Sequence, residues 1–252
     1  MEAARVAAER GHQVTLLEMN DHLGGQLAIA ARAPKRQDLS EFIQWQQREL
    51  DRLNVQVCLG RKATVDWILA DPPDAVVVAT GARPHVPEIP GMDQAHVLTA
   101  WDVLQELVET GQRIVLVDEE AQHQALSTAE FLLDQGKQVT VVTRHFYAGL
   151  DIGITTLVPL YERLFSKGID VTPHSRVAAI EPQSVTIENI YSGQIQNSPA
   201  DTVVLAAGGR ALDGLYHELK GRVGELHVAG DCVAPRKLHH ALLEGTRVAR
   251  AL

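Results

Sequence analysis

The chain has 252 residues, of which 45% are hydrophobic and 22% charged, and its formal net charge is -9 at pH 7. This composition is ordinary for a soluble globular protein, and the negative charge argues against a nucleic-acid partner. No run of apolar residues approaches the roughly 20 that span a bilayer, and no apolar signal core stands at the start, so we expect a cytoplasmic location and no membrane partner.

The first predicted elements are a helix over residues 2–10 and a buried strand over residues 14–17. Gly11 is expected to cap the helix, and Glu18 closes the strand. This order is the second half of a βαβ unit. In the dinucleotide fingerprint a strand and a GxGxxG turn precede such a helix, and an acidic residue after the second strand bonds the ribose hydroxyls. The spacing therefore predicts that Glu18 contacts a ribose.

The strand and glycine-rich turn that should precede this helix are missing ahead of Met1. The chain is then either an N-terminally truncated piece of a larger enzyme or a natural short protein without the loop. We favour truncation, because removal of a central parallel strand exposes apolar flanks and unpaired backbone groups. We expect such a fragment to bind nucleotide poorly.

The next elements are a long amphipathic helix over residues 38–53 and a short strand within LNVQVCLG. Two further apolar runs cover residues 75–79 and 203–207, and both lead into glycine. Ala79 is followed by Thr80 and Gly81, and the second run by Gly208 and Gly209. Such runs are typical of buried strands in a parallel sheet.

A second strand–helix–strand unit covers residues 113–118, 127–135 and 138–143, with Gly136 as the helix cap. The turn after its first strand, DEEAQH at residues 118–123, has three carboxylates and no glycine. A pyridine-nucleotide site needs a glycine-rich turn whose amides approach the pyrophosphate. The carboxylates repel a diphosphate by more than a helix dipole of about 0.3–1 kcal/mol can offset. We therefore expect no productive NAD(P) binding.

The closing segment, LHVAGDCVAPRKLHHALLEGTRVARAL, places a Gly230–Asp231 turn between an apolar strand and a helix. A carboxylate at a strand end can accept hydrogen bonds from ribityl hydroxyls, and the N-terminus of the following helix favours a flavin or a pyrophosphate. Gly230 lets the backbone approach closely. A plain loop is the competing interpretation, because Gly and Asp are common turn residues.

These motifs resemble those of a known family, the flavin and iron–sulfur oxidoreductases typified by 2,4-dienoyl-CoA reductase and by trimethylamine, dimethylamine and histamine dehydrogenases. VVVATGARP is similar to the first strand-to-loop crossover in the C-terminal, nucleotide-binding half of these enzymes. VAGDCVAPR followed by EGTRVAR is similar to its closing FAD or ADP segment, and the resemblance covers essentially the whole chain.

The resemblance implies an α/β fold with two Rossmann-like nucleotide-binding units of the FAD/NAD(P)-binding type, the first lacking its initial strand and glycine-rich loop. The expected domains are residues 1–100 as the first part of an FAD/ADP-binding domain, residues 101–213 as an inserted NAD(P)-binding-like domain, and residues 214–252 as the return segment of the first.

The resemblance also implies the cofactors and their binding positions. The expected cofactor is FAD, or ADP in its place, with FMN and a 4Fe-4S cluster only in a barrel domain that precedes this half in the family and is its partner in cis or in trans. In the family the LGGQL segment passes under the adenosine, where two adjacent glycines permit close backbone passage. The positions expected to bind the cofactor are Glu18, Gly24, Gly25, Gln26, Ala79, Thr80, Gly81, Gly230 and Asp231.

Neither the cysteines nor the histidines indicate a catalytic or metal site. Cys58 and Cys232 lie far apart in sequence, which excludes a CxxC redox pair and a four-cysteine cluster. The 11 histidines lack HxxxH or HExxH spacing. We expect no catalytic residue and no metal ligand in this chain, because the flavin would carry the redox step.

Two functions stay open at this point. The chain is either the dinucleotide-binding and electron-transfer half of a flavin-dependent oxidoreductase, of the amine dehydrogenase or enoyl reductase type, or a non-catalytic ADP-binding structural or interaction module. The acidic turn makes the second unit more similar to that of the amine dehydrogenases than to that of 2,4-dienoyl-CoA reductase. Flavin content separates the two functions, because an electron-carrying module needs an isoalloxazine ring and a structural module needs only ADP.

Overall fold

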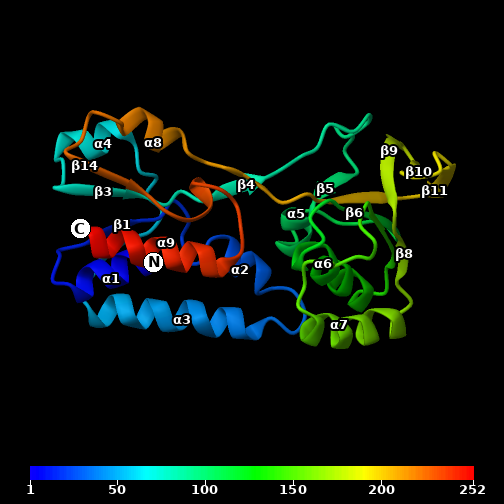
Figure 1. The fold of residues 1–252 in the computed structure, drawn as a ribbon, viewed down its shortest axis with the longest axis horizontal. Coiled ribbons are helices and arrows are strands. Elements are labelled where there is room, and N and C mark those ends of the chain that lie inside the picture. Colours follow the sequence, from blue (N-terminus) through cyan, green and yellow to red (C-terminus); the bar gives the residue numbers. More distant parts are fainter. The chain divides into compact units, whose positions relative to one another are not determined.

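The computed structural model describes residues 1–252, which form two compact units (Figure 1). Unit 1 comprises residues 1–31, 37–83 and 209–252, and unit 2 comprises residues 32–36 and 84–208. The expected domain boundaries, 100/101 and 213/214, lie elsewhere along the chain, and that domain assignment stays a prediction. The predicted α/β class is confirmed, since parallel strands alternate with helices in both units.

Unit 1 contains two separate parallel strand pairs, β1 with β2 and β14 with β3, and a third pair, β4 with β13. The strands are β1 (Thr15–Leu17), β2 (Gln56–Cys58), β3 (Ala75–Val78), β4 (Ala82–Pro84), β13 (Gly209–Ala211) and β14 (Glu225–Val228). The helices are α1 (Glu2–Glu9), α2 (Gln26–Ala30), α3 (Gln37–Arg52), α4 (Val65–Ala70), α8 (Gly214–Leu219), the short 3-10 helix η1 (Gly230–Cys232) and α9 (Leu238–Ala251).

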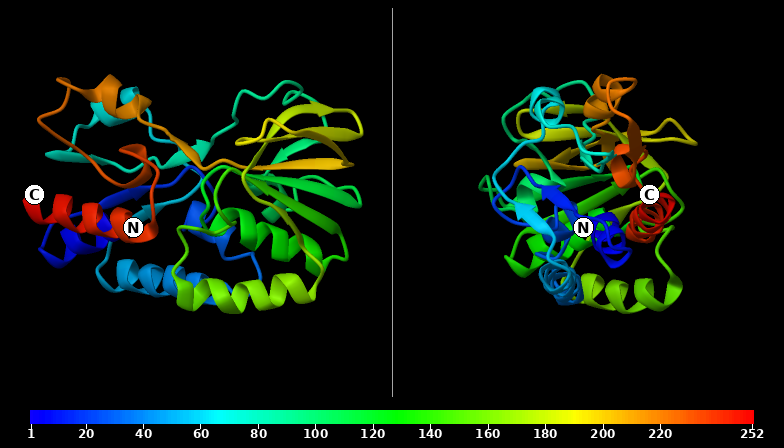
Figure 2. Two further views of the ribbon diagram at one scale, coloured as in Figure 1. Left: turned by 45° about the vertical axis from the view of Figure 1, so that its right-hand side comes forward. Right: turned by 90° about the vertical axis from the view of Figure 1, so that its left-hand side faces the viewer.

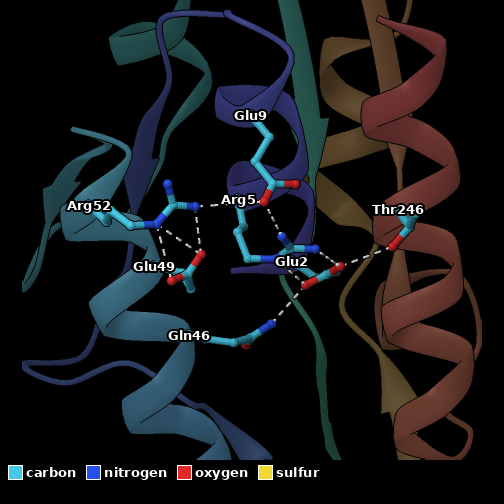
Figure 3. Close-up of polar contacts among 7 residues, drawn as sticks. All are labelled: Glu2, Arg5, Glu9, Gln46, Glu49, Arg52 and Thr246. Carbon is cyan, nitrogen blue, oxygen red and sulfur yellow. Dashed lines mark hydrogen bonds and ion pairs between the residues drawn. The ribbon is translucent and has the colours of Figure 1, made fainter.

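A polar network joins α1, α3 and α9 around Glu2 (Figure 3). The Glu2 carboxylate accepts hydrogen bonds from Arg5 one turn along α1, from Gln46 Nε2 of α3 at 3.0 Å and from Thr246 Oγ1 of α9 at 3.1 Å. Burial raises the pKa of the Glu2 carboxyl. The hydrogen bond and positive charge of Arg5, together with the hydrogen bonds from Thr246 and Gln46, lower it by more, so this pKa lies below its ordinary value. The first helix of unit 1 is therefore fixed to two others by one ionised side chain.

Unit 2 is built on a five-stranded parallel sheet with the order β5-β12-β6-β7-β8, and on a three-stranded antiparallel sheet with the order β11-β10-β9. The strands are β5 (Val97–Thr99), β6 (Arg113–Asp118), β7 (Gln138–Thr143), β8 (Asp170–Thr172), β9 (Ser175–Glu181), β10 (Ser184–Asn189), β11 (Ile195–Pro199) and β12 (Thr202–Ala206). The helices are α5 (Ala100–Leu104), α6 (His123–Asp134) and α7 (Ile154–Ser166).

The strand period of two divides β6 between two hydrophobic cores in unit 2. Ile114 and Leu116 pack with residues of α5, α6 and α7, whereas Val115 and Val117 pack with residues of β9 and β10. Because both faces are covered, the strand reads as a continuous apolar run. Figure 2 shows the result as a layer of helices, the parallel sheet and the antiparallel strands of this unit.

In unit 2, the predicted strands at residues 113–118 and 138–143 are confirmed at both ends. In unit 1, the predicted helices and strands are confirmed to within about two residues. Gly11 and Gly136 follow their helices with φ of +95° and +76°, as expected of C-terminal caps. The helix predicted at residues 127–135 begins earlier, at His123, and the antiparallel strands β9, β10 and β11 were not predicted. No helix has both the length and the apolar character needed to cross a bilayer.

Candidate dinucleotide site

The Gly230–Asp231 turn follows the parallel strand β14. Gly230 has a φ of +77°, in the left-handed region that favours glycine, and the turn forms η1. The N–H of Ala229 donates to the carbonyl of Val78 at 3.0 Å, which anchors the turn to the end of the neighbouring strand β3. A short loop separates the turn from α9, which begins at Leu238, so the helix does not follow the turn directly as its sequence suggests.

Asp231 contacts a residue from the other end of unit 1. Its Oδ2 accepts a hydrogen bond from Nε2 of Gln26 at 2.9 Å, although the two residues are 205 positions apart in sequence. Its Oδ1 accepts the backbone N–H of Arg236 at 3.2 Å. The carboxylate is partly exposed and held in one orientation. Two of the predicted cofactor positions, Gln26 and Asp231, are thus adjacent.

The glycine pair Gly24–Gly25 places Gln26 at the start of α2. Gly24 and Gly25 have φ of +114° and +50°. A Cβ on Gly24 would lie 2.8 Å from Cδ1 of Ile43, so a side chain at this position would require Ile43 to shift. The carbonyl of Gly24 accepts the N–H of Leu27 at 3.0 Å, which begins the helical turn. The two glycines therefore serve the sharp turn that orients Gln26.

Ala79, Thr80 and Gly81 lie after β3, where the chain passes towards β4. Gly81 has a φ of +74°, and a Cβ added there would lie 3.9 Å from Nε2 of Gln26. Thr80 donates its hydroxyl to the carbonyl of Leu212, and the N–H of Leu212 donates to the carbonyl of Gly81 at 3.0 Å. Ala79 and Thr80 are exposed. Gly81 therefore lies beside Gln26, whereas Thr80 is bonded to Leu212.

Glu18 lies at the end of β1 and makes contacts of its own. Its Oε1 accepts the backbone N–H and the side-chain amide of Asn20, both at 2.9 Å, while its own N–H donates to the carbonyl of Cys58. Its Oε2 takes part in neither bond to Asn20. Glu18 bonds Asn20 and Cys58, whereas Gln26, Gly81 and Asp231 lie together, so the structure does not bring Glu18 into the group around Gln26 by a hydrogen bond.

Glu244 is a site residue that sequence reasoning missed. Its Oε2 accepts the backbone N–H of Gly230 at 2.9 Å, and its Oε1 forms an ion pair with Arg236. A glutamate on the second turn of an amphipathic helix has the pattern of any solvated helix face. Its partner, a backbone amide in a preceding turn, leaves no mark in the sequence.

The group around Gln26 and Asp231 fits the sugar chain of a flavin dinucleotide. Asp231 supplies acceptor oxygens for hydroxyl groups, and Gln26 supplies an amide beside it. Gly81 and Gly230 remove the side chains that would hold a ligand away from the backbone; a Cβ on Gly230 would already be in contact with Ala241, at 3.6 Å. No group of three or more His, Cys, Asp or Glu side chains comes together to hold a metal ion.

The corresponding turn of unit 2 is occupied by its own carboxylates. Asp118, at the end of β6, is only 1% exposed, and its Oδ1 accepts the N–H of Ala121 at 2.8 Å. Burial raises the pKa of Asp118 despite this hydrogen bond. A Cβ on Gly208, at the end of β12, would lie 2.2 Å from Oε1 of Glu120, so the Glu120 carboxylate fills the space beside that glycine.

Arg144, which follows β7, pairs with a carboxylate of the acidic turn. Its Nε lies 3.0 Å from Oε2 of Glu119, and its side chain is 47% exposed. Position and charge alone are compatible with a 2′-phosphate partner. In the structure a carboxylate of the acidic turn takes that place.

A family profile described as pyridine nucleotide-disulphide oxidoreductase matches residues 1–245. The chain belongs to this family. It is 33% identical over 290 residues to N,N-dimethylglycine/sarcosine dehydrogenase of Chromohalobacter salexigens, covering 99% of this chain and 42% of that protein. It is 34% identical over 253 residues to bilirubin reductase of Mediterraneibacter gnavus, covering 100% of this chain and 39% of that protein.

Among solved structures, a complex of 2-naphthoyl-CoA reductase with 2-naphthoyl-CoA matches with a TM-score of 0.94 and 30% identity, covering 100% of this chain and 38% of that chain. The predicted kinship with 2,4-dienoyl-CoA reductase and the amine dehydrogenases, and the predicted FAD/NAD(P)-binding type of fold, are confirmed. The chain spans about 40% of the length of the curated relatives it matches. Relatives at similar identity are named as a dehydrogenase and as a reductase, so identity does not decide between these two reaction types.

Proposed function

We propose that this chain is the dinucleotide-binding half of a flavin-dependent oxidoreductase and that unit 1 binds FAD. The observation that carries the proposal is the contact between Gln26 and Asp231 beside Gly81 and Gly230. These residues come from opposite ends of the sequence, and they supply the acceptor, the donor and the close backbone approach that a ribityl chain needs.

Each group of the site has one task in this proposal. Asp231 accepts hydrogen bonds from ribityl hydroxyls, and Gln26 holds its carboxylate in place. Glu18 accepts hydrogen bonds from the ribose of the adenosine through Oε2, while Oε1 is held by Asn20. The flavin supplies the redox chemistry when bound, and the protein contributes binding and orientation.

Unit 2, in the same proposal, keeps the nucleotide-binding fold without taking NAD(P). The N–H of Ala121, which would face a pyrophosphate, is already bonded to Asp118, and Glu120 lies where a ligand would pass Gly208. A diphosphate would have to displace the buried carboxylate of Asp118 and the half-buried carboxylate of Glu120, both of its own sign, which is unfavourable where the dielectric constant is low.

The relatives are longer than this chain, and in our proposal the substrate reacts in the part that this chain does not cover. We infer a partner barrel domain that carries FMN and a 4Fe-4S cluster and oxidises an amine or reduces an enoyl thioester, in the cytoplasm. The closed turn of unit 2 favours the amine branch, because a reductase that takes hydride from NAD(P)H needs an open pyridine-nucleotide site.

A non-catalytic ADP-binding module is the second candidate. It is favoured by the same closed turn and by the bonds that both oxygens of Asp231 already make to the protein. The test is to release the bound small molecule from the protein as its source makes it, and to identify it by chromatography and absorbance. FAD supports the oxidoreductase, whereas ADP without FAD supports the structural module.

A further inference from the structure

Glu244 connects α9 to the Gly230–Asp231 turn through both of its oxygens. Oε2 accepts the N–H of Gly230 at 2.9 Å, and Oε1 pairs with the guanidinium of Arg236. Arg236 in turn donates its backbone N–H to Oδ1 of Asp231 at 3.2 Å. One carboxylate therefore holds the residue before Asp231 and a residue that holds Asp231 itself.

The Glu244 carboxylate is suited to this task because it stays ionised. Burial raises the pKa of Glu244, but the Arg236 guanidinium and the Gly230 N–H together lower it by more than burial raises it. The pKa of Glu244 therefore lies below its ordinary value. Hydrogen bonds to an ionised acceptor are about twice as strong as those between neutral groups. The turn is thus held by charge-assisted contacts.

The following residues of α9 make their contacts in another direction. Gly245 faces α1, where an added Cβ would lie 3.2 Å from the backbone nitrogen of Ala3. Thr246 donates its hydroxyl to Glu2 of α1, the bond drawn at the right of Figure 3. Glu244 and Thr246 lie two positions apart on one helix, and substitution can separate the turn contact from the helix contact.

We propose that Glu244 is a positioning residue for the flavin end of the cofactor, because it holds the Gly230–Asp231 turn in the conformation that presents Asp231 to the ribityl chain. The inference rests on the proposed function, since the ribityl chain is present in FAD and absent from ADP. Loss of Glu244 should therefore weaken FAD selectively and leave the contacts to the ADP portion in place.

The experiment measures FAD and ADP binding by calorimetric titration of the protein, as its source makes it, after its cofactor has been removed. Glu244→Ala is expected to weaken FAD about tenfold and ADP less than twofold. Glu244→Gln keeps an acceptor for the Gly230 N–H and should restore most of the FAD affinity. Thr246→Val, the matched variant on the same helix, should weaken FAD and ADP by the same factor.

The outcomes separate this inference from the function on which it rests. If the unaltered protein binds ADP as tightly as FAD, the proposed function fails, and the role of Glu244 fails with it. If the unaltered protein prefers FAD, but Glu244→Ala weakens both ligands equally, Glu244 is merely structural and only the inference fails. Should Glu244→Ala not fold, Glu244→Asp replaces it, because the shorter side chain keeps the charge but withdraws from Gly230; the same selective loss is expected, and an equal loss overturns the inference.

Discussion

Asp231 in unit 1 and Asp118 in unit 2 each stand where a parallel strand gives way to a turn, and their carboxylates face different partners. Asp231 is partly exposed and is held by Gln26 from another segment. Asp118 is 1% exposed and bonds Ala121 within its own turn. The Asp231 carboxylate is partly open to solvent, whereas the Asp118 carboxylate is buried and bonded within its own turn.

The difference lies in which residue supplies the turn. Gly230 gives unit 1 a left-handed turn with no side chain in the way. In unit 2 the left-handed position is Ala121, with a φ of +53°, and the residue before it, Glu120, directs its carboxylate beside Gly208. The two units thus share a strand followed by a turn, but only the turn of unit 2 has a carboxylate of its own beside the neighbouring glycine.

The largest expected effect comes from removing the carboxylate of unit 1. Asp231→Ala should weaken FAD about a hundredfold, because the ribityl chain loses its acceptor and Gln26 loses its partner. FAD retained after gel filtration measures the effect. Asp71→Ala, at an exposed position after α4, is the control and should retain FAD as the unaltered protein does. Equal retention by both variants would contradict the assignment of Asp231.

Glu18 should have a smaller effect that does not distinguish the two ligands. Glu18→Ala is expected to weaken FAD and ADP alike by about tenfold, because both contain the ribose that its carboxylate would bond. Competitive titration of the two ligands measures this ratio. A loss confined to FAD would place Glu18 at the flavin end and not at the ribose.

Gly24 should show how strongly the turn before α2 depends on glycine. Gly24→Ala adds both strain at a φ of +114° and a contact of 2.8 Å to Ile43, whereas Gly11→Ala adds strain at +95° with no atom within 4 Å. We expect Gly24→Ala to destabilise the protein by about 1–3 kcal/mol more than Gly11→Ala. Urea unfolding of the two variants gives the difference, and equal stabilities would mean that Ile43 moves aside.

The smallest effect concerns the buried carboxylate of unit 2. The pKa of Asp118 is raised in the folded protein by burial, so its ionised form opposes folding: this cost is absent below the ordinary pKa of an aspartate and appears in full above the raised pKa. Asp118→Asn should therefore raise the urea midpoint at neutral pH, and the gain should vanish as the pH falls below about 3.8. A variant less stable than the unaltered protein at neutral pH would show that ionised Asp118 stabilises the turn.

The sequence predicted those elements whose signal is local. The strands at 113–118 and 138–143 are continuous apolar runs, because both faces of the sheet are covered. The start of α6 was placed too late, since Gln122 caps it without a side-chain hydrogen bond. The strands β9 to β11 were missed because they are partly exposed and lack a continuous apolar run along their length, and their apolar residues become a core only against the parallel sheet.

The residues of the candidate site stay a prediction, and the sequence gives no sign of the contacts between them. Glycines and an aspartate at strand ends mark Gly81, Gly230 and Asp231 in the sequence. The pairing of Gln26 with Asp231 spans 205 positions and depends on how the two ends of unit 1 fold together, which no spacing encodes. The contact of Glu244 with a backbone amide likewise follows from the tertiary fold.

The most direct test of the contrast between the two turns is amide hydrogen exchange, followed by mass spectrometry with and without FAD. The account predicts that FAD slows exchange at residues 24–27 and 229–233 of unit 1 and leaves residues 119–123 of unit 2 unchanged. Protection at residues 119–123, or none at residues 229–233, would contradict it.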